Sequence, residues 1–314
     1  MLEFYRLDHV SQVVPDLDPQ VELMVGLFGY RRMRSWENQE AGCRGVRLAV
    51  PGTWNQHWEV LAPLGDATPL AKWLEERGGR GGLHHVAFEV PDVASVEKEL
   101  AVHGVTVTNG QAGKWVEVSL SPPDQGLGVL FRINGPGNHS MCGDNPKEWP
   151  DTVEVSEAPS LGIANIDHVC QAFRDRDELA RWYEEVAGFV QVWRTPDDEH
   201  PDMADLVMNV PGSSICWEII MPWGDEGSFI ARFLQRSGPI AHHVTLEVRN
   251  WDKAMEACQY HGVEPFDENS GETDGAKWRD IFLHPKQTGG VLTQLFWEER
   301  PGVWVRSDKI PPKR

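Results

Sequence analysis

The sequence lacks the features of several protein classes. Its five cysteines (Cys43, Cys142, Cys170, Cys216 and Cys258) are odd in number and lie far apart, with no Cys-x-x-Cys pair. This spacing indicates neither a disulfide framework nor a zinc knuckle. No apolar run is long enough for a membrane span, and the first residues lack the basic-then-apolar order of a signal peptide. We therefore expect a cytoplasmic protein without a membrane anchor.

Basic residues are also scarce. The chain has 29 Lys and Arg against 48 Asp and Glu, a formal net charge of −19. Binding to nucleic acid requires a basic surface, and anionic membranes attract cations, so the charge argues against both partners. The length of 314 residues and the 40% content of apolar residues are enough for two domains with sizeable cores.

What the sequence does contain is an internal repeat. Four motifs recur in the same order: LDHV (7–10) as IDHV (166–169), WEVLAP (58–63) as WEIIMP (217–222), LHHVAFEV (83–90) as AHHVTLEV (241–248), and GVLFRI (128–133) as GVLTQL (290–295). The first His and the Glu are 50 residues apart in both copies, and the Glu and the next His are 26 and 25 apart. Four motifs in register indicate a duplicated domain. The predicted parts are a first domain (1–135), a linker (136–161), a second domain (162–300) and a tail (301–314).

Each copy alternates strand and helix patterns. The predicted helices cover 18–28, 68–77 and 92–103 in the first copy and 176–186, 227–236 and 251–261 in the second. The order of elements makes each copy two βαβββ units, so the fold class is α+β. Because neighbouring strand residues face opposite sides of a sheet, Val86 and Phe88 should lie under helices and His85 on the open face. By the same alternation, only the second histidine of each His-His pair should reach the open face.

One set of residues in the second copy suits a metal ion. His168, Glu218 and His243 supply two imidazoles and a carboxylate, and Gln294 can add a neutral oxygen. Such a set can hold a divalent ion such as iron, cobalt, manganese, nickel or zinc. A single strand histidine is more often a packed residue than a ligand, and it is the repeated His…Glu…His spacing that favours a site.

The first copy offers a weaker version of this set. His9, Glu59 and His85 form a possible second site, but Arg132 stands where the second copy has Gln294. A guanidinium cannot ligate a cation, and it suits a substrate carboxylate instead, so Arg132 is a candidate substrate-binding residue. We therefore rank the second copy above the first.

At these residues the chain resembles the vicinal oxygen chelate (glyoxalase, bleomycin resistance and extradiol dioxygenase) superfamily. The segments LDHV, VLAPLGDATPLAKWLEERGGRGGLHHVAFEV and RDIFLHPKQTGGVLTQL are most similar to methylmalonyl-CoA epimerases. The resemblance implies two cupped sheets built from four βαβββ units. It also implies a metal-dependent enzyme whose ion binds neighbouring oxygens of a small-molecule substrate, with a homodimer as an open alternative.

The resemblance leaves three functions open. The first is an isomerase, epimerase or lyase that abstracts a proton next to a carbonyl while a divalent metal stabilises the enediolate. The last-strand carboxylate that serves epimerases as ligand and base is Gln294 here, so Asp205 becomes the candidate base and Gln294 a second candidate catalytic residue. The alternatives are an extradiol-type dioxygenase using iron(II) and a binding protein that sequesters a small ligand.

Overall fold

The structure is a computed structural model that describes residues 2–53, 56–111, 115–120, 128–136, 147–148, 158–196, 203–223 and 227–300. The predicted tail and most of the predicted linker lie outside the described residues. Helices and mixed strands alternate along the chain, which confirms the α+β prediction. None of the helices in the described ranges is long and apolar enough to cross a membrane.

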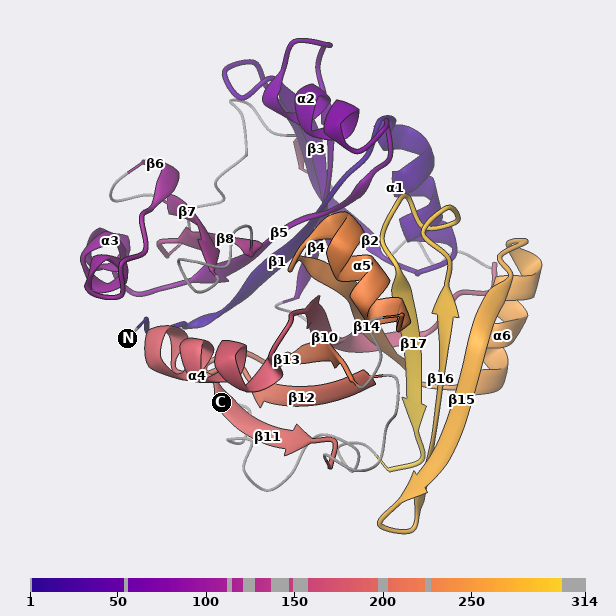
Figure 1. Cartoon of the computed structure of the whole chain (residues 1–314). Helices are drawn as coiled ribbons and strands as arrows, with labels where there is room; N and C mark the ends of the chain where they lie inside the picture. The colour runs from indigo at the N-terminus through magenta and orange to yellow at the C-terminus, as the bar shows by residue number, and fades with distance from the viewer. Residues whose placement is uncertain are drawn as a thin grey trace.

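The elements follow the predicted order in both copies (Figure 1). The first copy contains β1 (Arg6–Val13), α1 (Leu17–Gly26), β2 (Arg31–Asn38), β3 (Cys43–Ala49), β4 (His57–Pro63), α2 (Pro69–Glu76), β5 (Gly82–Glu89), α3 (Val93–Val102), β6 (Thr108–Gln111), β7 (Trp115–Leu120) and β8 (Val129–Asn134). The short strand β9 (Lys147–Glu148) follows. The second copy contains β10 (Ile163–Ala172), α4 (Arg176–Ala187), β11 (Val190–Arg194), β12 (Met203–Asn209), β13 (Cys216–Pro222), α5 (Phe229–Ser237), β14 (Ala241–Val248), α6 (Trp251–Tyr260), β15 (Pro265–Thr273), β16 (Ala276–Leu283) and β17 (Thr293–Glu298).

Each copy forms one curled sheet from two βαβββ units. The strand orders are β6-β7-β8-β5-β1-β4-β3-β2-β9 and β11-β12-β13-β10-β14-β17-β16-β15. In both sheets the first strands of the two units lie side by side and antiparallel at the centre, β1 with β5 and β10 with β14. The two sequence repeats therefore also have the same strand topology.

The helices begin where the sequence supplies capping side chains. Asp16, Asp92, Asp175 and Asn250 cap α1, α3, α4 and α6, while Thr68 and Ser228 cap α2 and α5. Each cap oxygen accepts a hydrogen bond from a free N–H of the first helical turn. The same positions carry caps in both copies, which explains why the copies share helix boundaries.

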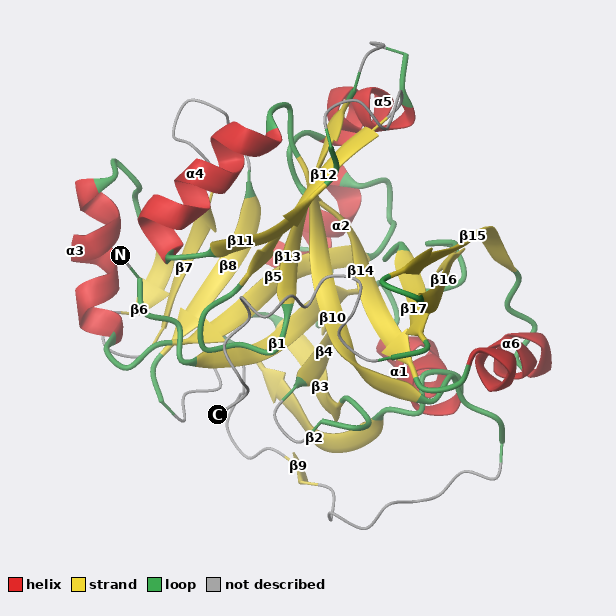
Figure 2. Cartoon of the chain, turned by 90° about the horizontal axis from the view of Figure 1, so that it is seen from below, coloured by secondary structure: helices red, strands yellow, loops and turns green. Residues whose placement is uncertain are grey.

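One hydrophobic core joins the two copies. It contains residues of α1, α3, α4 and α6 and one face of each sheet, including Val86 and Phe88 as predicted. In Figure 2, α3 lies beside α4 and α1 beside α6, so helices of different copies are neighbours. The helices α2 and α5 instead pack on separate small clusters with β1 and β4 and with β10 and β13. The opposite faces of the sheets carry the candidate site residues.

Candidate metal centre

The structure brings together the three residues predicted as ligands in the second copy. His168 lies on β10, Glu218 on β13 and His243 on β14, and each is nine-tenths or more buried. Nε2 of His168 and Nε2 of His243 lie 3.5 and 3.4 Å from Oε2 of Glu218. Ligands of one four-coordinate ion with bonds of about 2.1 Å are about 3.4 Å apart. These two distances fit a single ion, and all three donor atoms lie within 4.8 Å of one another.

Unpartnered polar atoms support the same fit. Oε2 of Glu218 and Nε2 of His243 are buried and find no hydrogen-bond partner among the described residues. A buried polar atom without a partner costs roughly 1–3 kcal/mol, so native proteins leave few of them. A cation between these two atoms would satisfy both.

β-Bulges in the central strands orient the side chains of the site. Asp167 is an extra residue opposite β14, because Ile166 pairs with Leu246 and His168 with Thr245. The bulge interrupts the strict alternation of the strand, so the Asp167 carboxylate reaches Nδ1 of His168 at 2.8 Å. A carboxylate on Nδ1 orients the ring so that Nε2 faces the other two residues of the triad. Asp167 is thus a positioning residue that our sequence reading missed, although Asp precedes His in both copies.

A second bulge falls at His242. His243 pairs with Cys170 and Ala241 with Gln171, so His242 is left over. The Nδ1 atoms of His242 and His243 lie 2.9 Å apart, and the His242 ring packs edge-on against Phe233 of α5. Strict alternation places only His243 on the open face, whereas the bulge also brings His242 to the space under α5.

Gln294 joins the site through a threonine. The Thr245 hydroxyl lies 2.8 Å from Nε2 of His168 and 2.6 Å from Oε1 of Gln294. The three residues form one cross-strand row on β10, β14 and β17. Gln294 therefore lies at the edge of the triad, where its amide oxygen is available to an ion or to a bound substrate.

Charges in the site are strongly coupled. Burial acts to lower the pKa of His168, but the Glu218 carboxylate and the Asp167 hydrogen bond raise it to about 10. Burial acts to raise the pKa of Glu218, but His168 and His243 lower it to about 2. Glu218 is thus held as a carboxylate, the form that binds a cation.

Asp205 faces the same space as Glu218. On β12, Val207 pairs with Glu218 of β13, so the two side chains share one face of the sheet. Asp205 is two residues from Val207 and therefore lies on that same face. Its Oδ1 is buried and meets no hydrogen-bonding group in the described part of the chain. Burial and the neighbouring Glu218 charge raise the pKa of Asp205 to about 7. This carboxyl can therefore exchange a proton near neutral pH.

Asp280 is a second carboxyl that sequence reasoning missed. It lies on β16, on the face that carries Gln294, and it is mostly buried. Asn269 donates a hydrogen bond of 3.3 Å to it. Burial raises the pKa of Asp280, while hydrogen bonds from Asn269 and Gln294 act to lower it. Asp280 lies in the segment 279–295 that resembles the epimerases, but only the fold of β15–β17 shows that it reaches Gln294.

The first copy has the same triad with different neighbours. Nε2 of His9 lies 3.1 Å from both Nε2 of His85 and Oε2 of Glu59. However, Arg47 pairs with Glu59 across the strands, with Nη1 at 3.6 Å from Oε1. Its Nη2 also lies 2.6 Å from Asp8. A fixed guanidinium charge here competes with a metal ion for the same carboxylate.

Arg132 occupies the place equivalent to Gln294. It pairs with Ala87 of β5, makes an ion pair with Glu117 of β7, and stacks on Trp115. Burial lowers its pKa to about 10, so it remains a cation. A second positive charge near His85 further disfavours a metal in the first copy.

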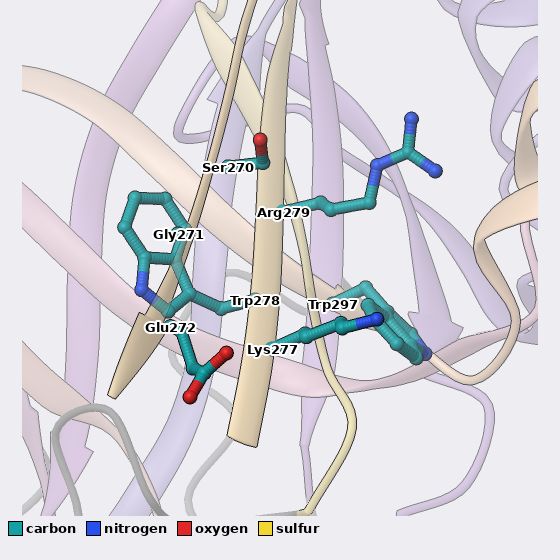
Figure 3. Close-up of a pocket in the computed structure, with 7 residues that line it drawn as sticks. All are labelled: Ser270, Gly271, Glu272, Lys277, Trp278, Arg279 and Trp297. Carbon is teal, nitrogen blue, oxygen red and sulfur yellow. The ribbon is translucent and has the colours of Figure 1, made fainter. Parts of the chain in front are cut away.

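A surface pocket lies at the far end of the second sheet, on β15, β16 and β17. Its lining consists of Ser270, Gly271, Glu272, Lys277, Trp278, Arg279 and Trp297. Figure 3 shows Trp278 on one side of the strands and Arg279 with Trp297 on the other. None of the predicted site residues lines this pocket. By alternation from Asp280, Trp278 shares the face of Gln294, at the outer end of the candidate site.

The fold and the site thus define a class of proteins with tandem curled sheets of paired βαβββ units, each sheet carrying a His–Glu–His triad. The chain belongs to the Glyoxalase/Bleomycin resistance protein/Dioxygenase superfamily, whose sequence model matches residues 8–118 and 167–282. The two matched segments correspond to the two copies, which confirms both the predicted superfamily and the duplication.

Relatives of two kinds are similar to this chain. Ethylmalonyl-CoA/methylmalonyl-CoA epimerase of Cereibacter sphaeroides is 30% identical over 102 residues, which are 32% of this chain and 73% of the relative. The 4-hydroxyphenylpyruvate dioxygenase of Yarrowia lipolytica is 23% identical over 346 residues, covering 97% of this chain and 86% of the relative. A mutant 4-hydroxymandelate synthase from Streptomyces coelicolor has the same fold, with a TM-score of 0.72, 14% identity, and coverage of 98% of this chain and 96% of that one.

Proposed function

We propose that this protein is a metal-dependent enzyme of the isomerase, epimerase or lyase type that removes a proton next to a carbonyl. His168, Glu218 and His243 would hold the divalent ion, with Gln294 at its edge. When bound, the ion supplies positive charge to neighbouring oxygens of the substrate. Asp167 orients His168, and Asp205 accepts the proton.

Asp205 carries this proposal. An effective general base has a pKa near the operating pH, and in the metal-free protein burial and the Glu218 charge raise the pKa of Asp205 toward that range, to about 7. Its buried Oδ1 finds no hydrogen-bond partner among the described residues, and Asp205 lies on the same face of the sheet as Glu218, which supports a proton acceptor close to the proposed ion. The epimerase relative is consistent with this type of chemistry.

Hydrogen exchange tests the proposal directly. Metal-loaded protein in deuterium oxide is mixed with acyl thioesters that carry an acidic α-proton, and deuterium uptake is followed by NMR. We expect uptake with the wild type and a loss of roughly 10²–10⁴-fold in Asp205→Asn, the usual range for a lost general base. Asp177→Asn, at an exposed ion pair with Arg194, is the matched control and should exchange normally. A wild type that exchanges no α-proton contradicts the proposed reaction, and a fully active Asp205→Asn contradicts the role of Asp205.

A ring-cleaving or related dioxygenase is the second candidate. The dioxygenase relative matches nearly the whole chain, and two histidines with one carboxylate are a donor set for iron(II). Here the carboxylate would be Glu218 of β13, because β17 supplies Gln294. Oxygen uptake on catechols by anaerobically purified, iron-loaded protein would favour this candidate over proton abstraction.

A further inference from the structure

A second group of potential ligands lies beside the triad. Cys170, His242 and His243 each place one ligand atom within 4.8 Å of the others. Cys170 lies on β10, pairs with Glu218 on one side and His243 on the other, and is fully buried. The group shares only His243 with the His168–Glu218–His243 triad.

The His243 ring has a different neighbour at each nitrogen. Nε2 is 3.4 Å from Glu218, whereas Nδ1 is 2.9 Å from Nδ1 of His242. The two nitrogens of an imidazole lie on opposite edges of the ring, so one histidine can bridge two neighbouring ions once it has lost its ring proton and become an imidazolate. The bulge at His242 produces this arrangement, because it brings His242 to the side of the sheet that Cys170 faces.

We propose that Cys170, His242 and His243 form a second, thiolate-containing metal site in the second copy. The proposal rests on the triad as a metal site, since the two sites share His243. One sulfur and two nitrogens suit zinc or cobalt(II), which accept soft and borderline donors in tetrahedral geometry. Binding converts the Cys170 thiol to a thiolate and, when both sites are filled, His243 to an imidazolate, and both protons are released to solvent.

The surroundings fit a metal of this kind. Cys170 packs with Ile220 of β13 and Ile230 of α5 in a small apolar cluster, which would shield a metal–sulfur bond from water. His242 is held against Phe233 of the same helix. The first copy has the equivalent histidines, His84 and His85, with their Nδ1 atoms 2.8 Å apart, but Ser11 in place of the thiol. At this position only the second copy therefore has a thiol.

Cobalt(II) titration tests the proposal. Metal-free, reduced protein is titrated with cobalt(II) without oxygen while the near-ultraviolet sulfur-to-cobalt charge-transfer band and the cobalt content are measured. We expect the wild type to show the band. Cys170→Ser should lose the band and should bind one equivalent of cobalt less than the wild type. Ser11 at the equivalent place shows that this fold accepts serine there. The matched control is Cys216→Ser, since Cys216 is also buried on the second sheet but belongs to neither group of ligands, and it should keep the band.

Other variants separate the two sites. Glu218→Gln weakens the triad and should reduce the cobalt content while keeping the band, whereas His243→Ala should affect both. No band in the wild type, or a band that survives in Cys170→Ser, overturns the thiolate site. If cobalt still binds without a band, and Glu218→Gln removes it, the triad stands alone. A wild type that binds no cobalt at all contradicts the metal centre of the proposed function as well.

Discussion

Single residues decide how the two copies differ. The triads superpose in sequence and in strand register, but Arg47 lies against Glu59 whereas Val207 lies opposite Glu218. Among the described residues both triads keep a buried carboxylate oxygen without a hydrogen-bond partner, but only Glu59 has a guanidinium against its other oxygen. Arg47 and Arg132 place guanidinium charge beside the first triad, where the second copy has Val207 and Gln294.

Removing the carboxylate behind His168 should weaken metal binding. In Asp167→Asn the ring loses its charged partner at Nδ1, so we expect metal affinity to fall roughly 10–100-fold. Competition with a chromophoric chelator measures this change. Asp8→Asn makes the same substitution in the first copy and should leave the affinity of the second-copy site unchanged. Equal losses in both variants would contradict the assignment of the ion to the second copy.

Asp205 should make the stability of the metal-free protein depend on pH. Because its pKa in the folded state is about 7, above the unfolded value, the folded state holds the proton more tightly. The free energy of unfolding should therefore fall as pH rises from about 4 to about 7, and this loss should be absent in Asp205→Asn. Urea unfolding of both proteins across this range measures the difference. If both curves have the same pH profile, the buried carboxyl is not protonated as we expect.

The start of helix α4 and the β-bulges of the central strands hold the site residues in place. Arg176, in the first turn of α4, is buried and donates to the carbonyl oxygens of Thr195 and Asp205. The start of α4 is thereby tied to the strand that carries Asp205. Bulges at Asp8, His84, Asp167 and His242 interrupt the central strands at the site residues of both copies. Regular strands could not bring these consecutive polar side chains to one space.

The cap of α4 should contribute to stability. Oδ1 of Asp175 accepts hydrogen bonds of 2.9 Å from the N–H groups of Asp177 and Glu178. We expect Asp175→Ala to lower the free energy of unfolding by about 1 kcal/mol, as is typical for a lost N-cap. Denaturant unfolding measures this, and Asp175→Asn, which keeps a capping oxygen, is the control. An unchanged alanine variant would show that the cap contributes nothing.

The whole molecule is a pair of sheets with a shared interior. The ring centroid of Phe131, in the first copy, lies 5.1 Å from that of Trp217 and 6.2 Å from that of Tyr183, both in the second copy. The Phe131 and Tyr183 rings are stacked. Gly81 of the first copy meets the loop before β17, and a Cβ at Gly81 would lie 2.4 Å from the carbonyl oxygen of Gly289. The copies are two repeats in sequence and topology, but they bury one core.

The two copies should therefore unfold together. Phe131→Ala leaves a cavity between them, and we expect it to destabilise the protein by about 3–5 kcal/mol. Tryptophan fluorescence and circular dichroism should then report one coincident transition in both wild type and variant. Two separate transitions in the wild type would contradict the shared core.

The sequence by itself determined the duplication, the βαβββ order and the membership of both triads. Those features depend on repeats, periodicity and spacing, which are local or regular along the chain. Asp167, Asp280 and Cys170 could not be assigned in this way. Their places depend on bulges and on strands far apart in sequence, so only the tertiary structure decided them. The same holds for the shared core, because a repeat specifies each sheet but not the face through which two sheets pack.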